Sequence, residues 1–199
     1  MRTNPPQPEV RSPKFSYFRP PIRNVFPSEE LDLAELCERI RGNNLAGITE
    51  RLRALPSVKE RQALKAQSFP YVTFAGIFRK RNDRELLEPS GLMVFDFDHL
   101  EQPSQVKQLL LNDRYFDTEL LFTSPSGKGL KWVVQHSQEM TPHREDFFLG
   151  VSNYLKASYG LEADRSGRDL SRACYICQDS EVHLNPSLTP GAVSSLQPP

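Results

Sequence analysis

Two aspartates at the end of an apolar run are the residues of this chain whose types and spacing best suit metal chemistry. Asp96 and Asp98 close the run Val94-Phe95-Asp96-Phe97-Asp98. Side chains alternate along a strand, so both carboxylates share one face and offer the hard oxygen ligands that Mg²⁺ or Mn²⁺ prefers. The alternative is a strand that leaves the core into an acidic turn, although aspartate is poorly suited to strands.

A loop rich in glycine, serine and lysine, residues 123–131, could hold phosphate groups. Its glycines permit unusual backbone angles and a close approach to a ligand, and its amides, hydroxyls and lysines suit an anion. The candidate phosphate-binding residues are Ser124, Ser126, Gly127, Lys128 and Lys131. The loop is not a Walker loop, because Phe122 stands where that motif requires glycine. A hairpin turn with solvated lysines remains the alternative.

The segment 162–177 mixes acids and arginines before a short apolar run. Asp164 could be a third metal ligand, and Arg172 could contact phosphate in a bidentate manner. A solvated loop with local ion pairs explains the same composition equally well. Cys174 and Cys177 form a CxxC without the further ligands of a zinc site or the helix of a redox motif, so they are interpreted as buried structural thiols.

Positive charge is concentrated in residues 51–84, which hold nine Lys and Arg against Glu60 and Asp83, a balance of 9 − 2 = +7. Such clustering attracts phosphate backbones, although a solvated helix face is the alternative. The predicted nucleic-acid contacts are Arg79, Lys80 and Arg81.

These candidates need a scaffold, and the pattern from Gly91 onward predicts the order strand, helix, strand, strand, helix, strand. This is the βαββαβ order of a ferredoxin-like sheet, in which the first and third strands are neighbours. The expected strands are 92–98, 119–123, 130–136 and 172–177, and the expected helices are 104–111 and 142–159, the second capped by Thr141 and ended by Gly160. Motifs on these two strands should therefore meet. Lys131 and Trp132 lie on opposite faces of the third strand, and one of those faces should be the one that carries Asp96 and Asp98.

Helical spacing dominates the preceding residues. Ser28 is predicted to cap a first helix, a second apolar stripe ends at Pro56, and a third helix is expected over 58–67. A strand is predicted over 71–78.

Composition sets the broad class. The chain has 199 residues, 38% of them hydrophobic, and 25 Lys and Arg balance 25 Asp and Glu, so no overall basic field indicates nucleic acid. Three cysteines fit a reducing compartment, the polar amino terminus is no signal peptide, and no apolar run reaches transmembrane length. We expect a cytoplasmic protein without membrane contact. Residues 1–14 are expected to be a flexible proline-rich arm, 15–186 a single domain with an internal boundary near Ser90, and 187–199 a disordered tail.

The chain resembles the VirE amino-terminal domain family of bacterial mobile elements over residues 15–186. The resemblance rests on Leu64-Lys65, the run from Thr73 to Phe78, Ser90-Gly91-Leu92 leading to Asp96 and Asp98, and Ser124-Pro125-Ser126-Gly127. That family is in turn similar to the archaeo-eukaryotic primase-polymerase superfamily, which has an RRM-like palm, an Asp-x-Asp motif, a Ser-x-His-type motif and a later Asp.

The resemblance implies that Asp96, Asp98 and Asp164 are catalytic and metal-binding. It places Lys131 where the superfamily has a phosphate-binding histidine, and lysine cannot titrate near neutral pH as imidazole does. The expected fold is α+β, a primase-polymerase-like sheet with helices on one face and an amino-terminal helical and basic elaboration over 15–90, before a palm-like core over 91–186. The expected ligands are Mg²⁺ or Mn²⁺, a nucleotide or single-stranded DNA, and a helicase or primase partner.

Three other functions stay open. The chain could be a non-catalytic module that binds single-stranded DNA through basic and aromatic residues. It could be a HAD-type phosphatase, because Phe95-Asp96-Phe97-Asp98 also resembles that family's motif, although His99-Leu100 replaces the expected Gly-Thr. An RRM-like RNA binder has the same element order, although aspartates on its central strand would repel phosphate.

Overall fold

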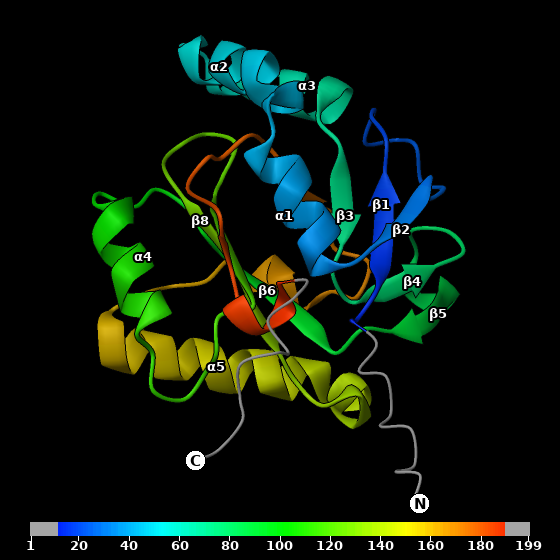
Figure 1. Cartoon of the computed structure of the whole chain (residues 1–199), viewed down its shortest axis with the longest axis vertical. Coiled ribbons are helices and arrows are strands. Elements are labelled where there is room, and N and C mark those ends of the chain that lie inside the picture. Colours follow the sequence, from blue (N-terminus) through cyan, green and yellow to red (C-terminus); the bar gives the residue numbers. More distant parts are fainter. Residues whose placement is uncertain (1–11, 190–199) are drawn as a thin grey trace, which may run out of the picture.

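The computed structural model describes residues 12–189, which form antiparallel sheets and helices of a mixed α+β fold (Figure 1). The strands are β1 (Phe15–Phe18), β2 (Glu29–Leu31), β3 (Tyr71–Thr73), β4 (Gly76–Phe78), β5 (Leu86–Pro89), β6 (Leu92–Phe97), β7 (Leu120–Thr123), β8 (Leu130–Gln135), β9 (Cys174–Tyr175) and β10 (His183–Leu184). The α-helices are α1 (Leu33–Arg41), α2 (Ala46–Ala54), α3 (Val58–Ser68), α4 (Pro103–Leu111) and α5 (Arg144–Tyr159). Short 3₁₀ turns are η1 (Asn43–Leu45), η2 (Asp83–Glu85), η3 (Gln138–His143), η4 (Arg165–Arg168) and η5 (Pro186–Leu188). The α+β class predicted from the sequence is confirmed.

The central sheet has the strand order β10-β7-β8-β6. β6 and β8 pair antiparallel, with Asp96 opposite Lys131, so the predicted pairing of the first and third strands is confirmed. The predicted fourth strand is shorter than expected and lies elsewhere. β9 pairs with β3 in a second sheet of order β2-β1-β3-β9, because Cys174 and Ile176 bury their side chains between the two sheets.

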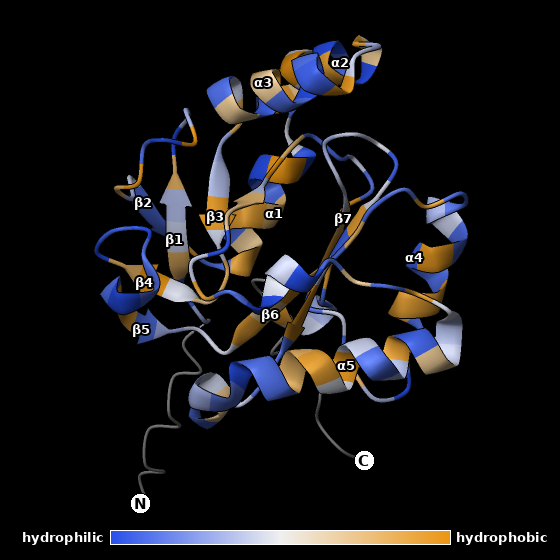
Figure 2. Ribbon diagram, turned by 180° about the vertical axis from the view of Figure 1, so that it is seen from behind, coloured by the Kyte–Doolittle hydropathy of each residue, from blue (hydrophilic) through white to orange (hydrophobic). Residues whose placement is uncertain are grey.

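One face of the central sheet packs against α4 and α5. Phe95, Phe97 and Trp132 are fully buried there, and Phe95 stacks on Phe148 of α5 with ring centroids 5.1 Å apart. Each such ring contributes about 1.5–3 kcal/mol through burial. Figure 2 shows that β6 and β7 are hydrophobic along most of their length, as expected for strands covered on both faces.

The opposite face of the central sheet is covered by α1 and the second sheet. Leu92, Val94 and Val133 share this core with Leu36 of α1 and Val72 of β3. The two helices of the predicted palm-like core, α4 and α5, do share one face of the sheet. The prediction that residues 15–90 form a helical elaboration is wrong, because these residues also supply β1–β5 and join the core.

The predicted boundary at Ser90 falls inside this shared structure. The Ser90 hydroxyl donates a hydrogen bond to the Phe74 carbonyl at 2.5 Å and accepts one from the Leu92 amide at 2.9 Å. Ser90 therefore ties the second sheet to β6.

Several helix ends follow the prediction and others differ. α2 ends before Pro56, α3 covers the third predicted helix, and Gly160 ends α5 in the left-handed region with φ of 68°. Thr141 does not cap α5, because η3 intervenes and the helix begins after His143. The predicted strand over 71–78 is two strands, β3 and β4, because the chain turns at residues 74–75.

The predicted capping residue of the first helix is also wrong. Ser28 donates a hydrogen bond to the Tyr17 carbonyl in the turn before β2, and Asp32 caps α1 instead. The Asp32 carboxylate accepts from the Glu35 amide, and the Glu35 carboxylate accepts from the Asp32 amide, both at 2.9 Å. This reciprocal pair satisfies amides that the helix leaves free.

Replacing Asp32 by alanine is expected to lower the free energy of unfolding by about 1 kcal/mol, the usual effect of losing such a cap. Urea denaturation measures the change. Glu30→Ala, at an exposed site on neighbouring β2, is the matched control and should stay within about 0.5 kcal/mol of the parent protein. Equal effects of the two substitutions would show that the cap does not stabilise α1.

The predictions of a flexible arm over 1–14 and a disordered tail over 187–199 fall largely on residues 1–11 and 190–199, outside the described residues. Among the described helices, none has both the length and the apolar character needed to cross a membrane.

Candidate functional site

Asp96 lies near the carboxyl end of β6, and Asp98 directly follows the strand. Phe95 and Phe97 point into the core beneath α5, so Asp96 faces the opposite side of the sheet. There it forms an ion pair with Lys131 of β8, the residue opposite it in the register. The side chains of this pair are only 14% and 11% exposed, so the pair is largely shielded from water.

Asp164 reaches the same place from the segment that follows α5. Its amide donates a hydrogen bond to the Asp96 carbonyl at 2.8 Å, and its carboxylate accepts one from the Ser166 amide at 3.0 Å. One carboxylate oxygen from each of Asp96, Asp98 and Asp164 lies within 4.8 Å of the other two. The structure thus brings together the three predicted metal ligands.

A buried arginine holds this segment against β6. Arg144, at the start of α5, donates to the Leu92 carbonyl at 3.0 Å and to the Gly167 carbonyl at 3.5 Å. Burial lowers the pKa of Arg144 to about 10, so it remains charged at neutral pH. Gly167 also packs against the Val94 carbonyl, where a side chain would be too close. Neither Arg144 nor Gly167 was selected as a site residue from the sequence.

The three carboxylates fit a divalent cation. Asp96 Oδ1 is buried and has no hydrogen-bond partner among the described residues, while Oδ2 is paired with Lys131. A buried acceptor without a partner is unfavourable unless a water or an ion satisfies it. Three carboxylate groups supply the hard oxygen atoms that Mg²⁺ and Mn²⁺ prefer.

The pKa values of Asp96 and Asp164 are shifted in opposite directions. Burial raises the pKa of Asp96 above its usual value, although the ion pair with Lys131 acts in the opposite direction. Burial also acts to raise the pKa of Asp164, but hydrogen bonds from Ser166 and the charges of Arg172 and Lys131 outweigh it, and the pKa lies below its usual value. Asp164 is therefore ionised at neutral pH.

The serine-containing loop between β7 and β8 forms one wall of the site. Ser124 Oγ lies 3.0 Å from Ser126 Oγ, and Arg53 of α2 donates to the Pro125 carbonyl at 3.3 Å. Gly127 has φ of 77°, a left-handed conformation that glycine adopts without strain. Gly129 allows a close approach between two parts of the protein and not to a ligand. Its Cα packs against the Phe97 carbonyl beside Asp98.

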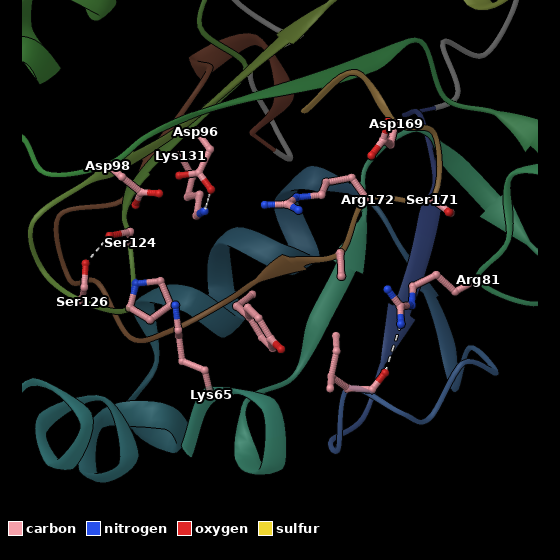
Figure 3. Close-up of a pocket in the computed structure, with 14 residues that line it drawn as sticks. Lys65, Arg81, Asp96, Asp98, Ser124, Ser126, Lys131, Asp169, Ser171 and Arg172 are labelled. Atoms are coloured by element: carbon pink, nitrogen blue, oxygen red, sulfur yellow. Dashed lines mark hydrogen bonds and ion pairs between the residues drawn. The ribbon is translucent and has the colours of Figure 1, made fainter. Parts of the chain in front are cut away.

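Beside these groups lies a pocket of about 430 Å³, a size typical of small-molecule sites. Asp164 is not among the residues that line it. Of the predicted phosphate-binding residues, Ser124, Ser126, Lys131 and Arg172 line the pocket, together with Asp96 and Asp98. Figure 3 shows the Arg172 guanidinium pointing toward Lys131 and Asp96. Gly127 and Lys128 are not among the lining residues, and the Lys128 side chain is exposed.

Other lining residues were not selected as site residues from the sequence. They are Ile22, Lys65, Pro125, Asp169, Ser171, Ala173 and Tyr175. Lys65 lies in the last turn of α3, with Nζ 5.9 Å from the centre of the Tyr175 ring. Burial, together with the charge of Lys131, lowers its pKa. Two features of the sequence could have indicated Lys65: the Leu64-Lys65 pair of the family resemblance and the +7 charge of residues 51–84.

The three predicted nucleic-acid contacts, which are consecutive in the chain, have side chains with different partners. Only Arg81 lines the pocket, where its guanidinium lies over the Tyr71 ring and donates to the Ile22 carbonyl at 3.2 Å. Arg79 lies 3.7 Å from Glu85, and Lys80 Nζ lies 5.7 Å from the centre of the Phe26 ring. The concentration of positive charge in residues 51–84 does not show which of these side chains have partners within the protein.

The two cysteines of the CxxC motif lie in the interior of the protein. Cys174 and Cys177 are buried and not disulfide-bonded, and Cys177 Sγ donates to the Thr123 carbonyl at 3.1 Å. Burial raises the pKa of both thiols to about 12, so neither is a thiolate at neutral pH. His99 is exposed, with φ of 57°, in the turn after Asp98.

Fold and pocket together define an α+β domain in which carboxylates, hydroxyls and cations converge beside the central sheet. Residues 63–183 match the model of the family described as BT4734-like, N-terminal domain. The match covers more than half of the 199 residues, so the chain belongs to this family. The matched residues include Asp96, Asp98, Asp164 and the serine-containing loop. No curated protein matches the chain, and no solved structure does either.

Proposed function

We propose that the pocket binds a nucleoside triphosphate together with Mg²⁺ or Mn²⁺, and that the domain is a primase-polymerase-like, nucleic-acid-associated protein of a mobile element. The observation that carries the proposal is the convergence of Asp96, Asp98 and Asp164 within 4.8 Å beside Lys131 and Arg172. Carboxylates alone suit a metal, and cations alone suit a phosphate. Both sets in one pocket suit a metal-bound polyphosphate.

Each group has a distinct role in this proposal. Asp96, Asp98 and Asp164 would hold the cation, and Lys131, Arg172 and the hydroxyls of Ser124 and Ser126 would contact phosphate oxygens. A bound divalent cation neutralises phosphate charge and orients the polyphosphate. The guanidinium of Arg172 suits paired phosphate oxygens, whereas Lys131 acts as a point charge.

Nucleotide binding is supported more strongly than catalysis. In the resemblance to the primase-polymerase superfamily, Lys131 stands where a histidine is expected. Its ammonium is paired with Asp96. Burial acts to lower the pKa of Lys131, but the neighbouring acidic groups, Asp96 among them, raise it overall, so it stays charged at neutral pH. A permanent cation holds phosphate but does not exchange protons near neutral pH.

The proposed macromolecular partner is single-stranded DNA, with a helicase or primase protein as a further partner. Arg81, Lys65 and Tyr175 at the pocket supply the cations and the aromatic ring that single-strand binding uses. The alternative of a non-catalytic DNA-binding module uses the same residues without the carboxylates.

Titration of a fluorescent nucleoside triphosphate in Mn²⁺, Mg²⁺ or EDTA tests the proposal. We expect saturable binding with either cation and loss of binding in EDTA. A parallel titration of single-stranded DNA at about 50 mM and 200 mM salt should show affinity that falls as salt rises. DNA binding without any metal-dependent nucleotide binding would overturn the proposal in favour of the DNA-binding module.

A further inference from the structure

Two carboxylates and two cations at the pocket are already paired with one another. Lys131 neutralises Asp96 in a largely buried ion pair, and Arg172 Nη2 lies 3.1 Å from Asp164 Oδ2. These are two of the three carboxylates that would hold a metal ion and two of the cations that would hold phosphate. In the free protein, therefore, Asp96 and Asp164 are paired with the same two cations that the phosphate would need.

This pairing disfavours either ion when it binds alone. A bare cation must compete with Lys131 and Arg172 for carboxylate oxygens, and it leaves both cations close to a new positive charge. A bare polyphosphate must draw the same two cations from their partners, and it leaves Asp96 and Asp164 near a new negative charge. Separating the largely buried Lys131–Asp96 pair is unfavourable because the remaining charge is uncompensated. The Arg172–Asp164 pair is half-exposed, so separating it costs less.

A metal-bound polyphosphate avoids both difficulties. Its cation can take the place of Lys131 and Arg172 on the carboxylates, while its phosphates take the place of the carboxylates on Lys131 and Arg172. Asp96 Oδ1, which is buried and has no hydrogen-bond partner within residues 12–189, offers a first contact that requires no pair to break. Lys65, which also lines the pocket, adds a further cation on the phosphate side.

We infer that Lys131 and Arg172 are specificity determinants that exclude bare divalent cations and make the pocket select a metal–polyphosphate complex. The inference rests on the proposed function and specifies how the same site chooses its ligand. It makes metal and polyphosphate binding reciprocally cooperative, because each ion releases the groups that the other requires.

The test uses the full chain and measures two affinities by electron paramagnetic resonance of Mn²⁺: that of bare Mn²⁺, and that of Mn²⁺ with excess inorganic triphosphate. Metal and triphosphate also associate in solution, so the wild-type comparison alone cannot separate the two causes. The informative variant is Arg172→Gln, at a half-exposed position where folding should be preserved.

For Arg172→Gln we expect bare Mn²⁺ to bind about tenfold more tightly and the triphosphate complex to bind about tenfold more weakly, within the usual range of coupling between sites. The matched control is Arg168→Gln, which removes an equal charge from the same segment where Arg168 pairs with Glu145 at 3.0 Å. It should change neither affinity by more than about twofold. Lys131→Gln provides a second variant with the same expected pattern.

Opposite changes in the two affinities support the inference. If bare Mn²⁺ binds Arg172→Gln no more tightly than it binds the parent protein, the arginine does not exclude the metal and the inference is wrong, while the proposed function stands. If the parent protein binds no Mn²⁺ with or without triphosphate, the proposed function itself is wrong.

Discussion

Replacing Asp96 and Asp98 together by asparagine is expected to weaken metal-dependent nucleotide binding by about 100-fold or more, since cation affinity depends on the number of charged ligands. Asparagine keeps the shape of each side chain but removes its charge. Only Asp164 would then remain of the three carboxylates. Titration of a fluorescent nucleoside triphosphate in Mn²⁺ measures the loss.

The matched control is Glu145→Gln/Asp146→Asn, which removes two exposed carboxylates from the first turn of α5. This control should bind the nucleotide as the parent protein does. Asp96→Asn leaves Lys131 without its partner, so the single variant Asp98→Asn, at an exposed position, separates loss of binding from loss of folding. Unchanged nucleotide binding by a folded double variant would contradict the assignment of these aspartates.

Gly129→Ala is expected to lower the free energy of unfolding by about 3 kcal/mol, toward the upper end of the usual effect of overpacking a filled site. A Cβ at this position would collide with the Phe97 carbonyl, and it would lie 3.0 Å from Ser124 Oγ and 3.3 Å from Asp98 Oδ1. The obstacle is backbone, which cannot rotate away as a flexible side chain could. The serine-containing loop should shift away from β6, and nucleotide binding should fall together with stability.

Gly150→Ala is the control for this substitution. Gly150 lies in α5, and a Cβ there would meet nothing within 4 Å. Alanine in a helix interior is expected to raise the free energy of unfolding by about 0.5–1 kcal/mol relative to glycine. Thermal and urea denaturation compare the two variants. Similar changes in both would show that Gly129 is not required for the contact between the loop and β6.

The central strands and part of the site could be predicted because their signals are local. Alternation along residues 94–98 placed Asp96 on the face of the strand that points away from the buried Phe95 and Phe97. The order of the elements placed β6 beside β8. Together these two patterns predicted that motifs on the two strands meet, but they left open whether Lys131 or Trp132 shares the face of Asp96. The register pairs Asp96 with Lys131. For Asp164, the acidic composition of its segment and the family resemblance suggested the residue, but neither specified the amide hydrogen bond that brings it to Asp96.

The second sheet could not be predicted because its strands are short and its pairings join distant parts of the chain. β2 has three residues and β9 has two, too few to show a period, and β9 pairs with a strand about one hundred residues earlier. The pairing of β9 with β3 places Tyr175 at the pocket, and the packing of α3 places Lys65 there as well. Arg144 was also missed, because the residue type alone does not show whether an arginine is buried or exposed.

The most direct test of the metal and nucleotide site is a crystal structure of the full chain with Mn²⁺ and a non-hydrolysable nucleoside triphosphate, located by anomalous scattering of the metal. We expect a manganese peak in contact with Asp96, Asp98 and Asp164, and phosphate density beside Lys131, Arg172 and the serine-containing loop. A manganese peak away from the three carboxylates, or a nucleotide outside the pocket with Lys131 still paired to Asp96, would contradict the proposed site.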